Sequence, residues 1–257
     1  MELMETSDRA NYKGESMNLS IKEAVKKKIV LGNNELNGQY KYTHVGLAGT
    51  ENYISHLGIV LMSLVHYNLS NHFMFHLFLS GVSALDVKRL EQFAIDTRSI
   101  VKVYVINDDF FSDVVNGMYT ASFFYRFIMP DVIKNDADQL IYMDGDMMCC
   151  GDINELVRLN FVNQIAAVVS DRDEKKQINQ LKVQRFFNSG MMVINVKQWI
   201  KENLLSKILA FSVDCMKQID SAGRNKAWGN ARYNDQNILN KMLDGRVLWL
   251  PKKYNYI

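Results

Sequence analysis

The sequence predicts an α/β fold: a mostly parallel, Rossmann-like central sheet with helices on both faces. Apolar runs at 44–48, 73–79 and 100–106 alternate with helical patterns. Strands that alternate with helices typically form a parallel sheet in which right-handed crossover connections join the strands. With 257 residues, 48% of them hydrophobic and 23% charged, the chain has the composition of a globular protein with a sizeable core.

The first predicted strand, residues 44–48, ends in a polar break at 49–52. The apolar residues that follow recur at spacings of three and four, which is typical of one buried face of a helix. They are Ile54, Leu57, Leu61, Leu64 and Val65. We therefore expect a helix directly after the break.

The second unit repeats this order. The compact apolar run 73–79 predicts a buried strand. Ser83 can cap the next helix, and Asp86 lies in its first turn, where a carboxylate is favourable. Residues 100–106, rich in Val and Ile, predict the third strand. Because ligands of parallel sheets bind at the carboxyl ends of the strands, we expect the site in the loops that follow such strands.

Charge and cysteine content exclude several function classes. The 30 Lys and Arg residues against 28 Asp and Glu give a net charge of +2, which predicts no nucleic-acid partner. Cys149, Cys150 and Cys215 are odd in number and lack a C-x-x-C spacing, which argues against a disulfide framework or a zinc site. No apolar run approaches the roughly 18 residues of a membrane span. We expect a cytoplasmic protein.

Residues 1–40 alternate charged residues with Asn, Gly and Ser, and they predict a mobile N-terminal arm ahead of a domain at 41–257. Lys26–Lys28 is the tight basic cluster of this arm. Two interpretations of the cluster stay open. It is either a solvated face or a weak electrostatic contact with the cytoplasmic face of an anionic inner membrane.

Two carboxylates, Asp144 and Asp146, follow the apolar run 140–143 and are separated by Gly145. Side chains at i and i+2 of an extended backbone share one face, so both can address a single cation. Carboxylate oxygens suit magnesium or manganese, and these ions also bind diphosphates. Gly145 would let backbone and ligand approach closely. The pattern predicts a divalent-cation site, with an ordinary surface turn as the alternative.

Five short motifs occur in order along the chain. They are Tyr125-Arg126-Phe127, Leu140 to Asp146, Phe187-Asn188-Ser189-Gly190, Asp235-Gln236-Asn237 through Asn240, and Leu250-Pro251 to Tyr254-Asn255. From about Tyr42 to the last residue, the sequence resembles the retaining glycosyltransferases of family 8. That family has a GT-A fold and includes the lipopolysaccharide core glucosyl- and galactosyltransferases.

The resemblance implies an enzyme that moves glucose or galactose from a UDP-sugar to a glycan hydroxyl in lipopolysaccharide core synthesis, with a glycan or a lipid-linked oligosaccharide as acceptor. Asp144 and Asp146 would hold manganese or magnesium, which stabilises the charge that grows on the departing UDP. Arg126 would bind the donor sugar or diphosphate, with a structural ion pair as the alternative. Asn188 would both donate and accept hydrogen bonds with sugar hydroxyls.

The resemblance also implies that Asp235 and Gln236 are catalytic and lie beside the transferred sugar. The alternative for Asp235 is the N-cap of the helix that runs to Leu243. Because an amide is a poor nucleophile, the implied path is front-face attack by the acceptor hydroxyl, with retention of configuration and with rate enhancement from positioning. The uridine contacts implied at the end of the first strand are Ala48, Thr50, Asn52 and Tyr53, with Tyr53 stacked on uracil. Thr50 stands where the family usually has Asp, and Asn237 also replaces an acidic residue.

Two residues are candidates for the acceptor side. Asp171 follows the apolar run 165–169, and Trp228 lies in a polar stretch just before Asp235. Core packing is the alternative for Trp228.

Family members continue past Asn255 with an H-x-x-G-x-x-K-P-W segment that supplies a third metal ligand and a diphosphate-binding Lys. This sequence ends at Ile257, so we expect the C-terminal part of the family domain to be absent from it. Three alternatives stay open: a nucleotide-sugar-binding module without turnover, a protein- or adhesin-modifying transferase of the same family, and a metal-dependent nucleotidyltransferase. The last would need a phosphate-binding loop richer in glycine than 49–51.

Overall fold

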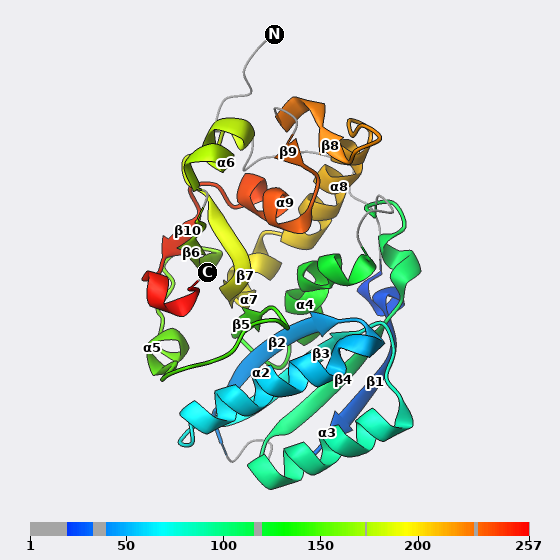
Figure 1. Cartoon of the computed structure of the whole chain (residues 1–257), viewed down its shortest axis with the longest axis vertical. Helices are drawn as coiled ribbons and strands as arrows, with labels where there is room; N and C mark the ends of the chain where they lie inside the picture. Colours follow the sequence, from blue (N-terminus) through cyan, green and yellow to red (C-terminus); the bar gives the residue numbers. More distant parts are fainter. Residues whose placement is uncertain (1–19, 33–39, 116–119, 173, 229–230, 257) are drawn as a thin grey trace.

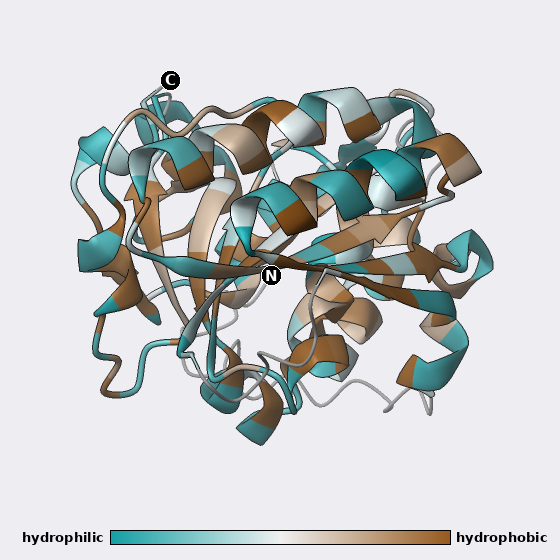
Figure 2. Cartoon of the chain, turned by 90° about the horizontal axis from the view of Figure 1, so that it is seen from below, coloured by the Kyte–Doolittle hydropathy of each residue, from teal (hydrophilic) through white to brown (hydrophobic). Residues whose placement is uncertain are grey.

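The computed structural model describes residues 20–32, 40–115, 120–172, 174–228 and 231–256. An eight-stranded sheet runs through them in the order β1-β4-β3-β2-β5-β7-β6-β10 (Figure 1). Figure 2 views this sheet along its edge, with helices above and below and mostly hydrophobic strands between them. The predicted α/β fold with helices on both faces is confirmed.

The strands are β1 (Val25–Leu31), β2 (Tyr42–Gly49), β3 (His72–Leu79), β4 (Ile100–Ile106), β5 (Gln139–Met143), β6 (Ala166–Ser170), β7 (Phe187–Asn195), β8 (Arg224–Asn225), β9 (Ala231–Arg232) and β10 (Val247–Trp249). The α-helices are α2 (Ile54–Tyr67), α3 (Ala84–Thr97), α4 (Tyr125–Ile133), α5 (Asn154–Val157), α6 (Glu174–Leu181), α7 (Val196–Lys201), α8 (Leu204–Met216) and α9 (Asp235–Met242). Short 3-10 turns include η1 (Ile21–Ala24), η3 (Glu51–Tyr53) and η7 (Lys252–Tyr254).

The unit β2-α2-β3-α3-β4 has the predicted order. Its three strands pair in parallel and cover the apolar runs at 44–48, 73–79 and 100–106. Ser83 caps α3, because its hydroxyl oxygen accepts a hydrogen bond from the backbone N–H of Asp86 at 3.1 Å. Beyond β5 the sheet is mixed: β7 runs antiparallel to both β5 and β6, while β10 pairs with β6 in parallel.

Part of the predicted N-terminal arm is ordered structure. Residues 21–24 form η1, and residues 25–31 form β1, an edge strand antiparallel to β4. The prediction of an arm therefore does not hold for residues 21–31, because backbone pairing with β4 and the burial of Leu31 hold this segment in the sheet. Lys26–Lys28 lies exposed on the edge strand, where charged residues hinder pairing with a further strand. Residues 1–19 and 33–39 of the predicted arm lie outside the described residues.

Two apolar cores cover the opposite faces of the sheet, because successive strand residues point to opposite sides. On one face, Val45 and Leu47 of β2 pack with α2 and α3; on the other, Leu140 and Tyr142 of β5 pack with α4, α7, α8 and α9. Gly46 lets α4 approach closely, since a Cβ there would lie 3.0 Å from the sulfur of Met129. Among the described residues, no helix combines the length and the apolar character needed to cross a bilayer.

Candidate active site

The predicted site residues come from neighbouring strand ends at one edge of the sheet. Asp144 follows β5, and Asn188 lies at the start of the antiparallel β7, so the two motifs meet. The backbone N–H of Asp144 donates to the carbonyl of Gly190 at 2.7 Å. Asp171 follows β6, whose end pairs with the start of β7. The topology thus brings together carboxylates and amides that lie far apart in the sequence.

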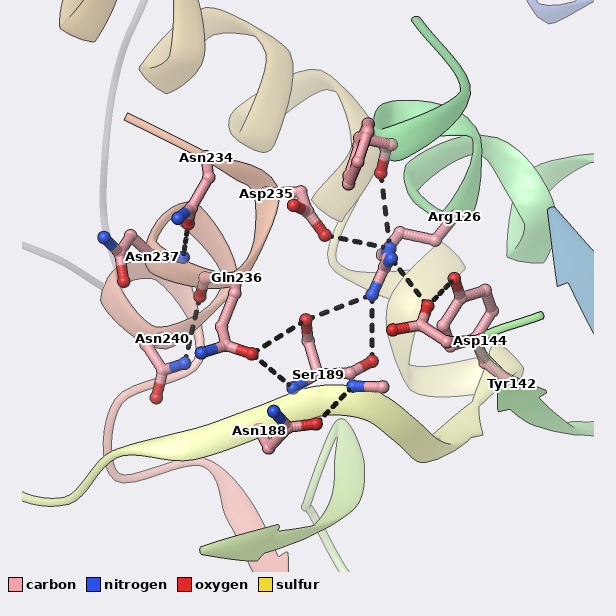
Figure 3. A network of polar contacts seen from close by, with 12 residues as sticks. Arg126, Tyr142, Asp144, Asn188, Ser189, Asn234, Asp235, Gln236, Asn237 and Asn240 are labelled. Carbon is pink, nitrogen blue, oxygen red and sulfur yellow. Dashed lines mark hydrogen bonds and ion pairs between the residues drawn. The ribbon is translucent and has the colours of Figure 1, made fainter. Parts of the chain in front are cut away.

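Arg126 on α4 is the centre of a buried polar network (Figure 3). Its guanidinium donates to Asp144 Oδ1 at 2.9 Å and pairs with Asp235 Oδ2 at 3.0 Å. It also donates to the carbonyl and the hydroxyl of Ser189, at 2.9 and 3.0 Å, and to the carbonyl of Phe123 at 3.3 Å. The guanidinium lies over the ring of Tyr142, 4.4 Å from its centroid. These contacts correspond to the ion-pair interpretation of Arg126.

Charge is not balanced in this network. Burial alone would lower the pKa of Arg126, but the carboxylates of Asp144 and Asp235 outweigh it and raise the pKa. Burial raises the pKa of Asp235, although Arg126 opposes that shift. Because one guanidinium faces two carboxyl groups, the network carries one net negative charge when both are ionised. A cation is therefore favoured nearby.

The two oxygens of Asp144 have different surroundings. Oδ1 accepts hydrogen bonds from Arg126 and from the hydroxyl of Tyr142, at 2.9 and 2.5 Å. Within the described part of the chain we find no hydrogen bond to Oδ2, and this oxygen would lie only 3.0 Å from a Cβ at Gly190. Gly190 has no side chain that would crowd Oδ2.

Asp144 and Asp146 line the same cleft of about 1160 Å³. The part of the chain that the structure describes holds no cluster of three or more His, Cys, Asp or Glu residues suited to a metal. Two carboxylates nevertheless suit magnesium or manganese, which commonly bind one or two carboxylates together with substrate phosphates and water. The donor set fits such a cation in the presence of a diphosphate.

Gly145 is needed for packing within the protein. A Cβ at this position would lie 2.5 Å from Leu57 Cδ2 and 2.8 Å from Tyr53 Cε1. A side chain at position 145 would therefore clash with Leu57 and Tyr53, and the approach of a ligand to the Gly145 backbone stays a prediction. This contact also places Tyr53, whose ring stacks on His56 at 4.4 Å, directly beside the two aspartates.

The other residues predicted to bind uridine lie at the end of β2. Ala48 and Thr50 are half-buried, and Asn52 is exposed in η3. The Thr50 carbonyl accepts a hydrogen bond from the backbone N–H of Tyr53 at 2.9 Å. No hydrogen bond to the side chain of Thr50 or Asn52 occurs within the described ranges, so both remain available to a ligand.

Asp171 lies between two predicted donor-binding amides. Its Oδ2 accepts from Asn188 Nδ2 at 3.2 Å and from Gln236 Nε2 at 3.3 Å. The Gln236 carbonyl oxygen in turn accepts from the backbone N–H of Ser189 at 3.0 Å. Asp171 thus lies in the same group of residues, and its role on the acceptor side stays a prediction.

Trp228 is not brought to this group. It is 4% exposed and packs between Phe211 and Tyr233, which is the core-packing alternative. Asp235 is also buried, at 5% exposure, and pairs with Arg126. Of the predicted site residues, Asp144, Asp146 and Asn188 line the cleft directly.

The helix that carries Asp235 and Gln236 is also joined to β7 through the side-chain amide of Asn240. Asn240 accepts from the backbone N–H of Phe187 at 2.8 Å and donates to its carbonyl at 2.9 Å, as a neighbouring strand would. Asn237 donates to the carbonyl of Arg232 at 2.7 Å, a bond that an ionised acidic residue could not make. The amide at 237 is thus explained by its local partner.

Sequence reasoning gave no role to Ser189 or Tyr142. Ser189 lies within a recognised motif, but its contacts with Arg126 come from 63 residues away and carry no local signal. Tyr142 had a detectable signal: it lies two residues before Asp144 in an extended segment, so the two side chains share a face.

The sequence model of glycosyl transferase family 8 matches residues 44–257. The chain belongs to this family. A lipopolysaccharide 1,2-glucosyltransferase of Escherichia coli is 30% identical over 214 residues, which are 80% of this chain and 60% of that protein. A lipopolysaccharide 1,3-galactosyltransferase of Salmonella typhimurium is 27% identical over 214 residues, with the same coverage of 80% and 60%. The chain therefore spans about three-fifths of the length of these curated relatives.

The family 8 fold is also found among solved structures. The galactosyltransferase LgtC, in complex with donor and acceptor sugar analogs, superposes with a TM-score of 0.69 and 20% identity, covering 82% of this chain and 74% of LgtC. At this identity the likeness shows the fold alone, which is the GT-A type.

Proposed function

We propose that this family 8 chain binds a UDP-hexose and transfers its glucose or galactose, with retention of configuration, to a hydroxyl of a lipopolysaccharide core oligosaccharide. The observation that carries the proposal is the cleft of about 1160 Å³ on which Asp144, Asp146 and Asn188 converge. The proposal is supported by the two carboxyl groups that share one guanidinium behind the cleft, and by the amide of Asn188, the proposed sugar contact. The relatives from Escherichia coli and Salmonella typhimurium support the acceptor class.

Asp144, through Oδ2, and Asp146 would hold the divalent cation together with the diphosphate. When bound, manganese or magnesium supplies charge neutralisation to the departing UDP. Arg126 holds Asp144 in place, because its guanidinium and the hydroxyl of Tyr142 both occupy Oδ1. The protein thereby presents one fixed carboxylate oxygen instead of a freely rotating group.

In the proposed reaction, Asn188 and Gln236 orient the hexose, and Asp171 accepts a hydrogen bond from the acceptor hydroxyl. The hydroxyl attacks from the face that UDP leaves, and its proton passes to the departing diphosphate. Asp171 is suited to the acceptor because it already contacts both donor-side amides. Asp235 lies behind this layer and acts by fixing Arg126.

The test is a thermal-shift series with UDP, UDP-glucose, UDP-galactose and CDP, with and without manganese, followed by an assay of UDP release with a core oligosaccharide acceptor. We expect manganese-dependent stabilisation by the uridine nucleotides and UDP release. Asp146→Ala should abolish the manganese dependence, whereas Asp152→Asn, at another exposed aspartate of the same cleft, should retain it. Binding without release would favour a binding module, and no stabilisation would exclude both functions.

We also propose a cytoplasmic location with a weak contact between Lys26–Lys28 and an anionic membrane surface. The support is the exposure of all three lysines on the edge strand β1. Co-sedimentation with vesicles containing about 30% anionic lipid at low salt tests this contact. Replacing the three lysines by glutamine should abolish it, and equal sedimentation of both proteins would contradict it.

A further inference from the structure

The motif from Leu250 to Asn255 ends in a buried amide at the cleft. The chain leaves β10, turns through η7 and brings Asn255 to the start of β7. Asn255 is 7% exposed, and its Nδ2 donates to Asn188 Oδ1 at 2.8 Å. The two asparagines are 67 residues apart in the sequence, and both line the cleft.

The orientation of the Asn188 amide is fixed by its other neighbours. The backbone N–H of Gly190 lies 2.8 Å from Asn188 Oδ1, and a backbone N–H can only donate. On the opposite side, Asn188 Nδ2 lies 3.2 Å from a carboxylate oxygen of Asp171, which accepts when ionised. The oxygen of Asn188 must therefore face Gly190 and Asn255, and position 255 must supply a donor.

This arrangement limits what Asn188 can offer to a ligand. Its amide oxygen has two lone pairs, and both are used, by Gly190 and Asn255. One of its two amide hydrogens is used by Asp171, which leaves a single N–H for a bound sugar. The expectation that Asn188 both donates to and accepts from hydroxyls is thus reduced to donation alone.

We infer that Asn255 is a positioning residue that locks the Asn188 amide as a hydrogen-bond donor toward the donor sugar; this inference rests on the proposed function. Asn188 then recognises a hydroxyl oxygen in the accepting role at one fixed place. Without the bond from Asn255, the Asn188 amide loses one of three contacts that define its plane.

A merely structural role for this bond is a weaker explanation, because η7 has other anchors. Lys253 Nζ pairs with Glu155 at 2.9 Å, and the hydroxyl of Tyr254 also donates to Glu155. Both contacts join η7 to α5 without involving Asn188. We therefore expect the segment to stay in place when the side chain at 255 changes.

The first experiment needs no ligand. Asn255→Asp keeps the shape of the side chain but replaces the donor by a carboxylate oxygen, which repels Asn188 Oδ1. The side-chain amide NMR signals of Asn188 are identified by their loss in Asn188→Ala. We expect the chemical shifts of these signals to change in Asn255→Asp. The signals should stay unchanged in the control Lys253→Gln, because the side chain of the neighbouring Lys253 contacts Glu155 and not Asn188. Unmoved signals in Asn255→Asp would overturn the inference, whatever the protein does with nucleotide sugars.

The second experiment measures the donor. Losing one hydrogen bond should raise the KM for UDP-hexose about tenfold in Asn255→Asp. The affinity for UDP, which lacks the hexose, should not change. In an Asn188→Ala background the same substitution should have no further effect, because Asn255 acts through Asn188. An equal loss in both backgrounds, or an equal loss for UDP, would refute the positioning role. If the unsubstituted chain binds no UDP-hexose, the proposed function fails and the donor role of Asn255 fails with it, whereas the NMR result still decides whether Asn255 fixes the amide.

Discussion

Tyr142 donates its hydroxyl hydrogen to Asp144 Oδ1, 2.5 Å away, from two residues earlier at the same strand end. The hydroxyl shares this oxygen with Arg126, so Tyr142 helps decide which carboxylate oxygen faces the cleft.

Tyr142→Phe should weaken the manganese-dependent binding of UDP. The loss of one hydrogen bond to a charged oxygen costs about 1 to 2 kcal/mol. We therefore expect the manganese concentration for half-maximal UDP binding to rise roughly five- to thirtyfold. Titration of manganese at saturating UDP measures this value. Tyr104→Phe is the matched control, because Tyr104 is a buried tyrosine on another strand whose hydroxyl contacts His76 at 3.2 Å. An unchanged manganese requirement in Tyr142→Phe would show that Asp144 is oriented without Tyr142.

Arg126→Met should destabilise the fold strongly, because it leaves Asp144 and the buried Asp235 without their cation. Removing one partner of a buried ion pair typically costs about 3 to 5 kcal/mol. Urea unfolding measures the change in the free energy of unfolding. Arg89→Met, at an exposed arginine that pairs with Asp86 on the surface, should lower it by about 0 to 1 kcal/mol. Equal effects of the two substitutions would contradict the central role of Arg126.

Gly145→Ala should be destabilising because the new methyl group meets Leu57 and Tyr53 at distances that real contacts do not reach. Overpacking of this kind costs about 1 to 3 kcal/mol. Gly151→Ala is a close control in the same segment, since a Cβ there meets no atom within 4 Å. Thermal and urea unfolding compare the two variants, and equal stability would mean that the space at Gly145 is not restricted.

Stability should also fall in mild acid because of His44. Burial lowers the pKa of His44 to about 4, from about 6.5 in an unfolded chain. Between these values the unfolded chain binds more protons, so the free energy of unfolding decreases as the pH falls from about 6.5 toward 4. His76, 3.0 Å from His44, has its pKa lowered by burial in the same direction.

Urea unfolding between about pH 7.5 and pH 5 checks this slope. His44→Phe should make the slope shallower, whereas His66→Gln, at an exposed histidine, should leave it unchanged. The comparison concerns the slope, because the lost contact with His76 alters the absolute stability. A slope equal to that of the unsubstituted protein in His44→Phe would exclude His44 as its source.

Local patterns were sufficient to predict the parallel half of the sheet. The helical stripe that begins at Ile54 and the cap at Ser83 are signals within one element, and the structure contains both α2 and α3 where they predict. Strand β1 was missed because three consecutive lysines do not alternate, and its pairing with β4 is made about 75 residues away. An edge strand such as β1 has a weak hydrophobic pattern, so it forms because its backbone pairs with a neighbouring strand.

The candidate site was predicted as a set of residues and less well as a set of contacts. Motif order located Asp144, Asn188 and Gln236, and the topology places them at one edge. The hydrogen bonds and ion pairs of the Arg126 guanidinium depend on Ser189 and Asp235, which are 63 and 109 positions away in the sequence. No local signal in the sequence predicts these contacts. The burial of Trp228 is likewise a property of its neighbours, Phe211 and Tyr233.

The bond between the Asp144 N–H and the Gly190 carbonyl continues the ladder of β5 and β7. A single residue inserted in one of these strands would turn the side chains beyond it to the opposite face and move the motif of that strand out of register with the other motif. Changes of chain length are therefore expected in the connections that lead to these strands and not within the strands themselves.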